Sequence, residues 1–166
     1  MAKKGQYFSF DAVIATVIMV LAFSSLVAYW YGAQSVVEER TNSRLADAGR
    51  IAESLLSPGA PEGWDNGMSI ADIRQIGIAT GFNNELDSWK VKQFSSLAQQ
   101  SPDGVGKLLR AGGSYYVLIE RTEQAGAPIA AVGDYPPANA SYVVVANRGV
   151  TYEGHPARMR VFLWKQ

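Results

Sequence analysis

The chain has 166 residues, a formal net charge of zero and no cysteine. This length suits one small domain plus an anchor, and the balanced charge gives no indication of a nucleic-acid partner. Disulfides, thiolate-bound metals and thiol nucleophiles are excluded, and a single histidine, His155, excludes a zinc site built on several histidines. We expect no metal site and no cofactor.

The first predicted element is an apolar helix. Residues 12–33 carry no charge, and Asp11 is the only charged residue between Gln6 and Gln34. At 1.5 Å per residue this run extends about 33 Å, enough to cross a hydrocarbon core of roughly 30 Å. We interpret residues 6–34 as a membrane-spanning helix. The alternatives are the core helix of a soluble domain, for which the run is too uniformly apolar, and a cleavable secretory signal, for which it is too long.

The charged residues on either side of this helix predict its orientation. Lys3 and Lys4 precede it, whereas Glu38 and Glu39 follow it. The positive-inside rule therefore places the N-terminus in the cytoplasm and the rest of the chain on the extracellular side of the cell membrane.

The first eleven residues combine a short basic leader with Gly5, Gln6 and Asp11 ahead of the apolar run. This arrangement resembles the class III signal of archaeal type IV pilin-like proteins. The resemblance implies that residues 1–5 are a leader, that a prepilin-type peptidase cuts between Gly5 and Gln6, and that the apolar helix remains as anchor and assembly helix. Asp11 would be the sixth mature residue, whereas the family places its acid at the fifth.

Asp11 has two interpretations. A carboxylate in the first helical turn satisfies free amides and suits the helix dipole. A carboxylate at the edge of a membrane helix is also tolerated when it reaches water or a partner, so Asp11 is a candidate intersubunit contact.

Residues 35–56 predict an amphipathic continuation of the same helix. Apolar residues recur at steps of three and four, and charged residues occupy the other faces. The apolar series is Val37, Thr41, Leu45, Ala48, Ala52 and Leu55. Ser57-Pro58-Gly59 ends the helix, which gives one element from about residue 11 to residue 56.

Residues 57–166 predict a small domain of the α+β class. Three short helices are expected, the first opened by a weak capping box of Ser69 and Asp72 and the third by Ser101 as N-cap with Pro102 after it. Their ranges are 70–77, 88–98 and 102–110. Strands are expected at 115–119, 142–146, 150–152 and 158–164, with turns at 147–149 and 153–156. The strands form an antiparallel sheet of three or four members.

The outer domain carries one modification motif and no catalytic motif. Asn139-Ala140-Ser141 is an N-glycosylation acceptor in a predicted extracellular loop. No nucleotide-binding or nucleophile-elbow signature is present, so we do not expect an enzyme. The Leu55–Gly59 segment, Trp64 and the later Ile76-Gly77-Ile78-Ala79 are also similar to uncharacterised envelope proteins of methanogens and related archaea, a resemblance that implies no activity.

Two functions are therefore expected. The first is a type IV pilin-like structural subunit of a surface filament or pseudopilus, which self-assembles through its N-terminal helix. The second is a single-pass membrane-anchored binding or accessory protein that does not polymerise. Cleavage between Gly5 and Gln6 together with homo-oligomerisation favours the first, and an intact N-terminus with a monomeric state favours the second.

Overall fold

The computed structural model describes residues 4–81, 84–123 and 128–165, and it describes only the backbone of residues 4–9 and 36–41. The chain divides into two compact units, Met1–Asn42 and Ser43–Gln166. One helix, α1 (Lys4–Leu55), contributes to both units. The predicted single long helix is thus confirmed, and it begins seven residues earlier than the sequence indicated.

Within the first unit, α1 is apolar and its side chains from residue 10 to residue 35 are exposed. Three of the hydroxyl groups there, on Thr16, Ser25 and Ser35, are bonded to carbonyls of the helix itself. Thr16 donates to the carbonyl of Ala12 at 2.8 Å, and Ser25 donates to that of Leu21 at 2.9 Å. These bonds satisfy the hydroxyl groups within the helix, as an apolar segment requires.

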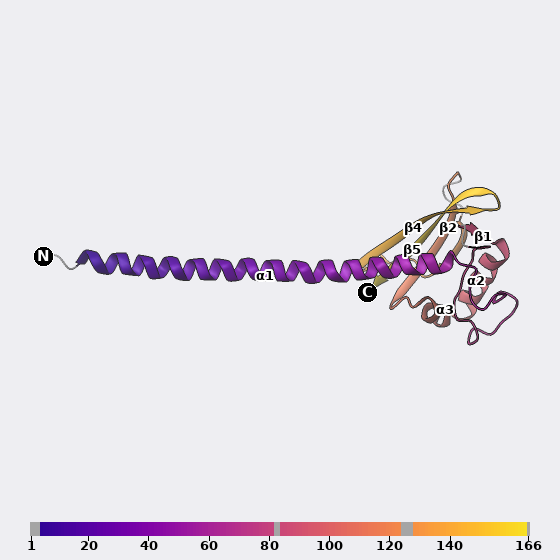
Figure 1. Cartoon of the computed structure of the whole chain (residues 1–166), viewed down its shortest axis with the longest axis horizontal. Coiled ribbons are helices and arrows are strands. Elements are labelled where there is room, and N and C mark those ends of the chain that lie inside the picture. The colour runs from indigo at the N-terminus through magenta and orange to yellow at the C-terminus, as the bar shows by residue number, and fades with distance from the viewer. Residues whose placement is uncertain (1–3, 82–83, 124–127, 166) are drawn as a thin grey trace. The chain divides into compact units, whose positions relative to one another are not determined.

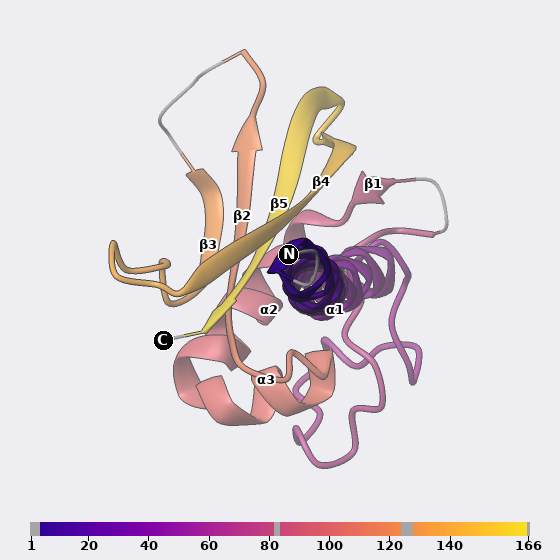
Figure 2. The same cartoon turned by 90° about the vertical axis from the view of Figure 1, so that its left-hand side faces the viewer.

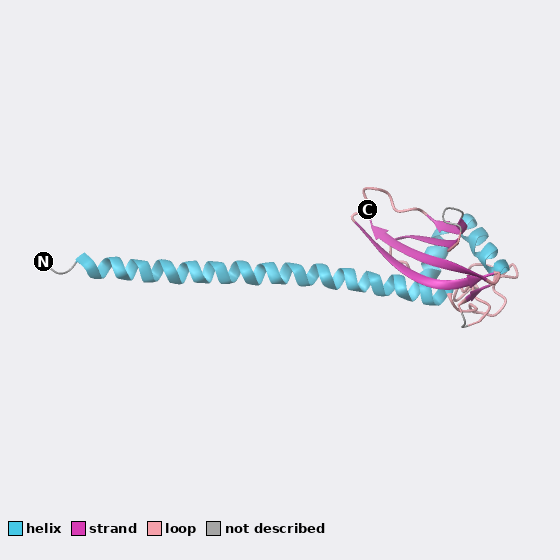
Figure 3. Ribbon diagram, turned by 90° about the horizontal axis from the view of Figure 1, so that it is seen from above, coloured by secondary structure: helices cyan, strands magenta, loops and turns pink. Residues whose placement is uncertain are grey.

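Within the second unit, the last turns of α1 are part of the hydrophobic core. Ala48, Ile51, Ala52 and Leu55 are fully buried in the same cluster as the strands that follow. Figures 1 and 3 show these turns running alongside the sheet. The prediction for Leu45 is wrong in one respect, because this residue of the expected apolar series is 50% exposed.

In the described ranges the sheet has five strands, in the order β1-β4-β5-β2-β3, and Figure 2 shows them side by side from β3 at one edge to β1 at the other. The strands are β1 (Glu85–Leu86), β2 (Ser114–Arg121), β3 (Pro128–Gly133), β4 (Tyr142–Tyr152) and β5 (His155–Lys165). The α+β class is confirmed. The predicted count of three or four strands is wrong, and the sheet is mixed, because β1 pairs in parallel with β4 while the other pairs are antiparallel.

β4 and β5 form one long hairpin. Glu153 and Gly154 both have positive φ, 51° and 77°, as a two-residue turn between right-twisted strands requires. The turn predicted at residues 147–149 is wrong. These residues continue β4 and pair with residues 158–160 of β5, so the ladder overrides the local preference of Asn-Arg-Gly for a turn.

Two helices complete the second unit. α2 (Ser88–Gln100) begins after Asp87, whose carboxylate accepts from the amides of Trp89 at 2.8 Å and Lys90 at 3.1 Å. α3 (Pro102–Leu109) has Pro102 in its first turn, and its N-cap Ser101 makes no side-chain capping bond. Both predicted helices are confirmed within two residues at their ends.

The end of α3 is held by α1. The guanidinium of Arg50 donates to the carbonyls of Leu109 at 3.2 Å and Arg110 at 2.9 Å, and Arg44 donates to that of Gly112 at 3.2 Å. The final carbonyls of a helix have no partner within the helix, so Arg50 satisfies groups that α3 leaves open, while Arg44 holds the loop that follows.

The helix predicted at residues 70–77 is wrong. The amides of Arg74, Ile78 and Ala79 donate to the carbonyls of Ala60, Leu55 and Ser57, which fixes this segment against the chain that leaves α1. A side chain at Gly77 would collide with the carbonyl of Ser57, so only glycine allows this approach. Long-range pairing of the backbone therefore outweighs the weak capping box.

Replacement of Ile51 by Ala tests whether α1 is part of the core of the second unit. We expect Ile51→Ala to lower the free energy of unfolding by about 2–5 kcal/mol, because it removes a fully buried side chain. The matched control is Leu45→Ala on the same helix, for which we expect less than about 0.5 kcal/mol. Denaturant titration of the full chain in detergent, followed by tryptophan fluorescence, measures both. Equal losses for the two variants would contradict this account.

Candidate functional site

The predicted processing residues, Gly5 and Gln6, lie in the first turns of α1, and their side chains are outside the described residues. Asp11 is exposed and lies seven residues after the start of the helix. The interpretation of Asp11 as a carboxylate that satisfies free amides at the helix start is therefore wrong, since a capping residue must lie at the first turn. Its interpretation as an intersubunit contact stays a prediction.

Among the described residues, one helix segment, Phe10–Ser35, is long and apolar enough to cross a membrane. None of this segment is buried. A core helix of a soluble domain would be covered by the rest of its chain, so the exposure argues against that alternative.

The sequon lies on the surface. Asn139 is exposed in a turn between β3 and β4, and Ser141 is exposed two residues later. The amide of Ser141 donates to the carbonyl of Lys165 at 2.9 Å, which ties the end of this loop to β5. A glycosyltransferase could reach this asparagine without unfolding the domain.

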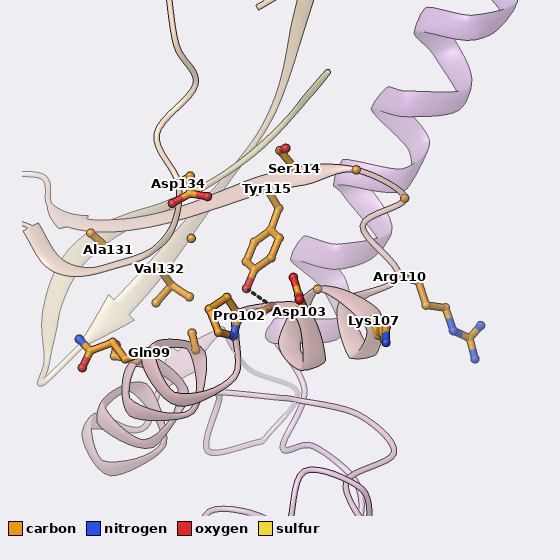
Figure 4. Close-up of a pocket in the computed structure, with 16 residues that line it drawn as sticks. Gln99, Pro102, Asp103, Lys107, Arg110, Ser114, Tyr115, Ala131, Val132 and Asp134 are labelled. Carbon is orange, nitrogen blue, oxygen red and sulfur yellow. Dashed lines mark hydrogen bonds between the residues drawn. The ribbon is translucent and has the colours of Figure 1, made fainter. Parts of the chain in front are cut away.

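A cavity of about 640 Å³ lies between α2, α3 and the neighbouring ends of β2 and β3. Its size falls within the range of small-molecule sites. Tyr115 of β2 crosses it towards the start of α3, as Figure 4 shows, and its hydroxyl donates to the carbonyl of Pro102 at 3.4 Å. Glycines border the tyrosine: a Cβ at Gly106 would lie 3.2 Å from the ring, and one at Gly133 would collide with the Tyr115 carbonyl.

The charged groups of this cavity balance one another. Asp103 and Asp134 carry the negative charges, and Lys107 and Arg110 the positive ones. All four side chains are exposed, and none of them forms an ion pair within the described part of the chain. The cavity therefore presents mixed charge to solvent and favours neither an anion nor a cation.

Tyr115 has a shifted acidity. Burial, followed by the nearby carboxylates of Asp134 and Asp103, raises its pKa to about 12. The phenol therefore keeps its proton at neutral pH, so it can form hydrogen bonds but cannot serve as a general base. The sequence did not predict this cavity, because its lining residues come from four elements and no local motif indicates it.

No group of three or more histidine, cysteine or carboxylate side chains could hold a metal ion in the described ranges. His155, the one histidine, is exposed at the first position of β5, away from the cavity lining. No family model matches the chain, and neither a curated protein nor a solved structure matches it.

Ionisation of Tyr115 should destabilise the outer unit. Its pKa is about 12 in the folded state against about 10 when unfolded, so between these values the folded state binds more protons. The free energy of unfolding should therefore fall as pH rises from 10 to 12. Tyr115→Phe should reduce this slope, while the raised pKa of buried Tyr152 leaves part of it in place. Urea titrations at pH 10 and 11.5 measure how much unfolding free energy each protein loses between the two pH values. An equal loss in wild type and Tyr115→Phe would contradict the assignment.

Replacement of Asn139 tests the sequon. We expect mass spectrometry of the native protein to show a hexose-containing mass increment at Asn139 that Asn139→Gln abolishes. The control is Asn147→Gln, which lies outside any sequon. A native peptide containing Asn139 that has the mass of the unmodified peptide would refute modification at this residue.

Proposed function

We propose that this chain is a type IV pilin-like structural subunit of a surface filament or pseudopilus, anchored in the cell membrane by its N-terminal helix. The single observation that carries the proposal is the make-up of α1. Its segment Phe10–Ser35 is apolar and exposed, whereas one face of its last turns is buried in the core through Ala48, Ile51, Ala52 and Leu55.

An exposed apolar segment of this length needs a partner that removes it from water. Large side chains such as Met19, Leu21 and Phe23 are 71%, 62% and 65% exposed. Each such side chain gains about 1.5–3 kcal/mol on full burial, so the segment would be covered by lipid or by other copies of the same helix. A type IV pilin-like subunit uses both, first in the membrane and then in the assembled filament.

The proposed processing gives the helix its mature start. A prepilin-type peptidase would remove residues 1–5, leaving Gln6 as the first residue of a helix that α1 already forms from Lys4 onwards. The basic leader, with Lys3 and Lys4, would lie in the cytoplasm before cleavage, and residues 57–166 would lie outside the membrane.

The alternative function is an anchored accessory protein that does not polymerise. Two observations favour it: Asp11 is one position later than the acid of the resembled family, and the outer unit has a cavity of about 640 Å³. One residue rotates a helix by about 100°, so the carboxylate would face a different direction. In this case the anchor would hold the cavity at the membrane surface.

Mass spectrometry of the N-terminus of protein from its native membrane distinguishes these functions. We expect a chain that begins at Gln6. A Gly5→Val variant should retain its leader and fail to appear in filaments under the electron microscope, since a bulky residue would block cleavage. Ala2→Val is the matched control, because it adds the same side chain inside the leader but away from the cut. A native chain that retains Lys3 and Lys4 would contradict the pilin-like function and support the accessory function.

A further inference from the structure

The face of the sheet that points away from the core carries an aromatic patch, which we define as Tyr116, Tyr135 and Phe162. Tyr116 and Phe162 are directly opposite each other on β2 and β5, with ring centroids 5.7 Å apart. Tyr135 lies against both, at 5.4 Å from Tyr116 and 6.4 Å from Phe162, and is 70% exposed. Aromatic clusters of this kind are enriched at protein interfaces.

An ionic network borders the patch on the same face. The carboxylate of Glu120 on β2 accepts from Arg158 at 2.6 Å and from Arg160 at 2.9 Å. The guanidinium of Arg160 also lies 5.7 Å from the centre of the Phe162 ring. Two arginines share one carboxylate, whose pKa is lowered chiefly by its bond to Arg158, so the border remains positive overall.

Charge is distributed unevenly along the outer unit. The β4–β5 hairpin, residues 142–165, has four basic residues and one acidic residue. The segment after α1, residues 57–87, has five acidic residues and one basic residue. We define its acidic loop as Glu62, Asp65 and Asp72, which form no ion pair within the described part of the chain.

The acidic loop and the aromatic patch lie on different sides of the sheet. The loop is fixed to the end of α1, where the amide of Ile78 donates to the carbonyl of Leu55 and the indole of Trp64 donates to that of Gly77 at 3.0 Å. Figures 1 and 2 show this loop on the helix side of the sheet. The positive border therefore cannot be neutralised by the acidic loop of its own subunit.

We propose that the aromatic patch and its arginine border bind the acidic loop of a second copy of this chain. The contact is heterologous, since it joins two different surfaces, and a heterologous contact that does not close into a ring produces an open filament. Tyr135 and Phe162 would be its apolar anchors, while Arg158 would face the carboxylates of Glu62 and Asp65. This inference rests on the proposed function and specifies the contact between outer units that the assembly would use.

Mixed cross-linking tests this contact, because the chain has no native cysteine. Two full-length proteins, Ala131→Cys and Ala71→Cys, are co-assembled in lipid nanodiscs or detergent and treated with a short bis-maleimide. Ala131 is exposed on β3, opposite Leu118 and on the face of the aromatic patch, and Ala71 is exposed next to Asp72, so both surfaces keep their own side chains. We expect cross-linked dimers in the mixture and none from either protein alone. Dimers from Ala131→Cys alone would mean a two-fold symmetric contact and would overturn the proposal.

Charge reversal provides an independent test. Arg158→Glu should abolish the mixed cross-link, and Glu62→Arg with Asp65→Arg in the other protein should restore it. Asp103→Arg, an exposed acid of α3 outside both surfaces, is the control and should not restore it. Circular dichroism of each variant verifies that the fold is retained. A cross-link that survives Arg158→Glu would overturn the proposal.

Assembly of the full chain separates the inference from the function on which it rests. We expect Tyr135→Ala to weaken assembly about tenfold or more, as loss of an interface aromatic does, while Trp89→Ala, an aromatic on α2 that is 53% exposed, leaves it unchanged. If wild type assembles and Tyr135→Ala assembles equally well, the patch contact is wrong and the proposed function stands. If wild type never assembles, both fail.

Discussion

The burial of the last turns of α1 is the constraint on which the outer unit depends. Ile51 and Leu55 supply fully buried side chains to a core that also includes strands and both short helices. The same turns supply polar contacts: Arg50 binds the final carbonyls of α3, and Glu53 accepts from Arg148 of β4 at 2.8 Å. A small sheet has one face that must be covered, and here the cover is the continuation of an apolar helix. Removing these last turns would therefore expose the core, so the end of α1 is part of the second unit.

In the proposed assembly, the two parts of the chain would contribute different kinds of contact. The apolar segment Phe10–Ser35 requires lipid or other helices, and the outer unit offers a positive aromatic surface and a separate acidic loop. Contacts through the helix are non-polar and carry little directional information, because lipid and neighbouring helices are equally apolar. Charged and aromatic surfaces on the outer units would supply the register that the helices lack. A division of this kind assigns affinity to the helix and specificity to the domain.

The sequence predicted the elements with strong local signals and missed those that depend on distant partners. The long apolar run, the Asp87-Ser88 start of α2 and the Pro102 start of α3 are each encoded within a few residues. β3 was not predicted because Pro128–Gly133 is short and built largely of small residues. β1 was not predicted because its two residues are held by distant partners, the far end of β4 and a bridge from Leu86 to Ala79. The turn predicted at Asn147-Arg148-Gly149 was wrong because β5 pairs with those residues across the hairpin. The cavity and the aromatic patch could not be predicted, since each gathers side chains from segments that only the tertiary fold brings together.

The most direct test of the central claim is thiol labelling of two single-cysteine variants in intact cells. Ala22→Cys lies in the apolar segment and Glu123→Cys in the outer unit, and both positions are exposed in the isolated chain. The account predicts that a membrane-impermeant maleimide labels Glu123→Cys from outside, and that it labels Ala22→Cys only after detergent dissolves the membrane and separates the helices. Protection of Ala22→Cys would have to come from lipid or from other subunits, because its own chain does not cover it. Equal labelling of the two variants in intact cells would contradict the claim that α1 is a membrane and assembly helix.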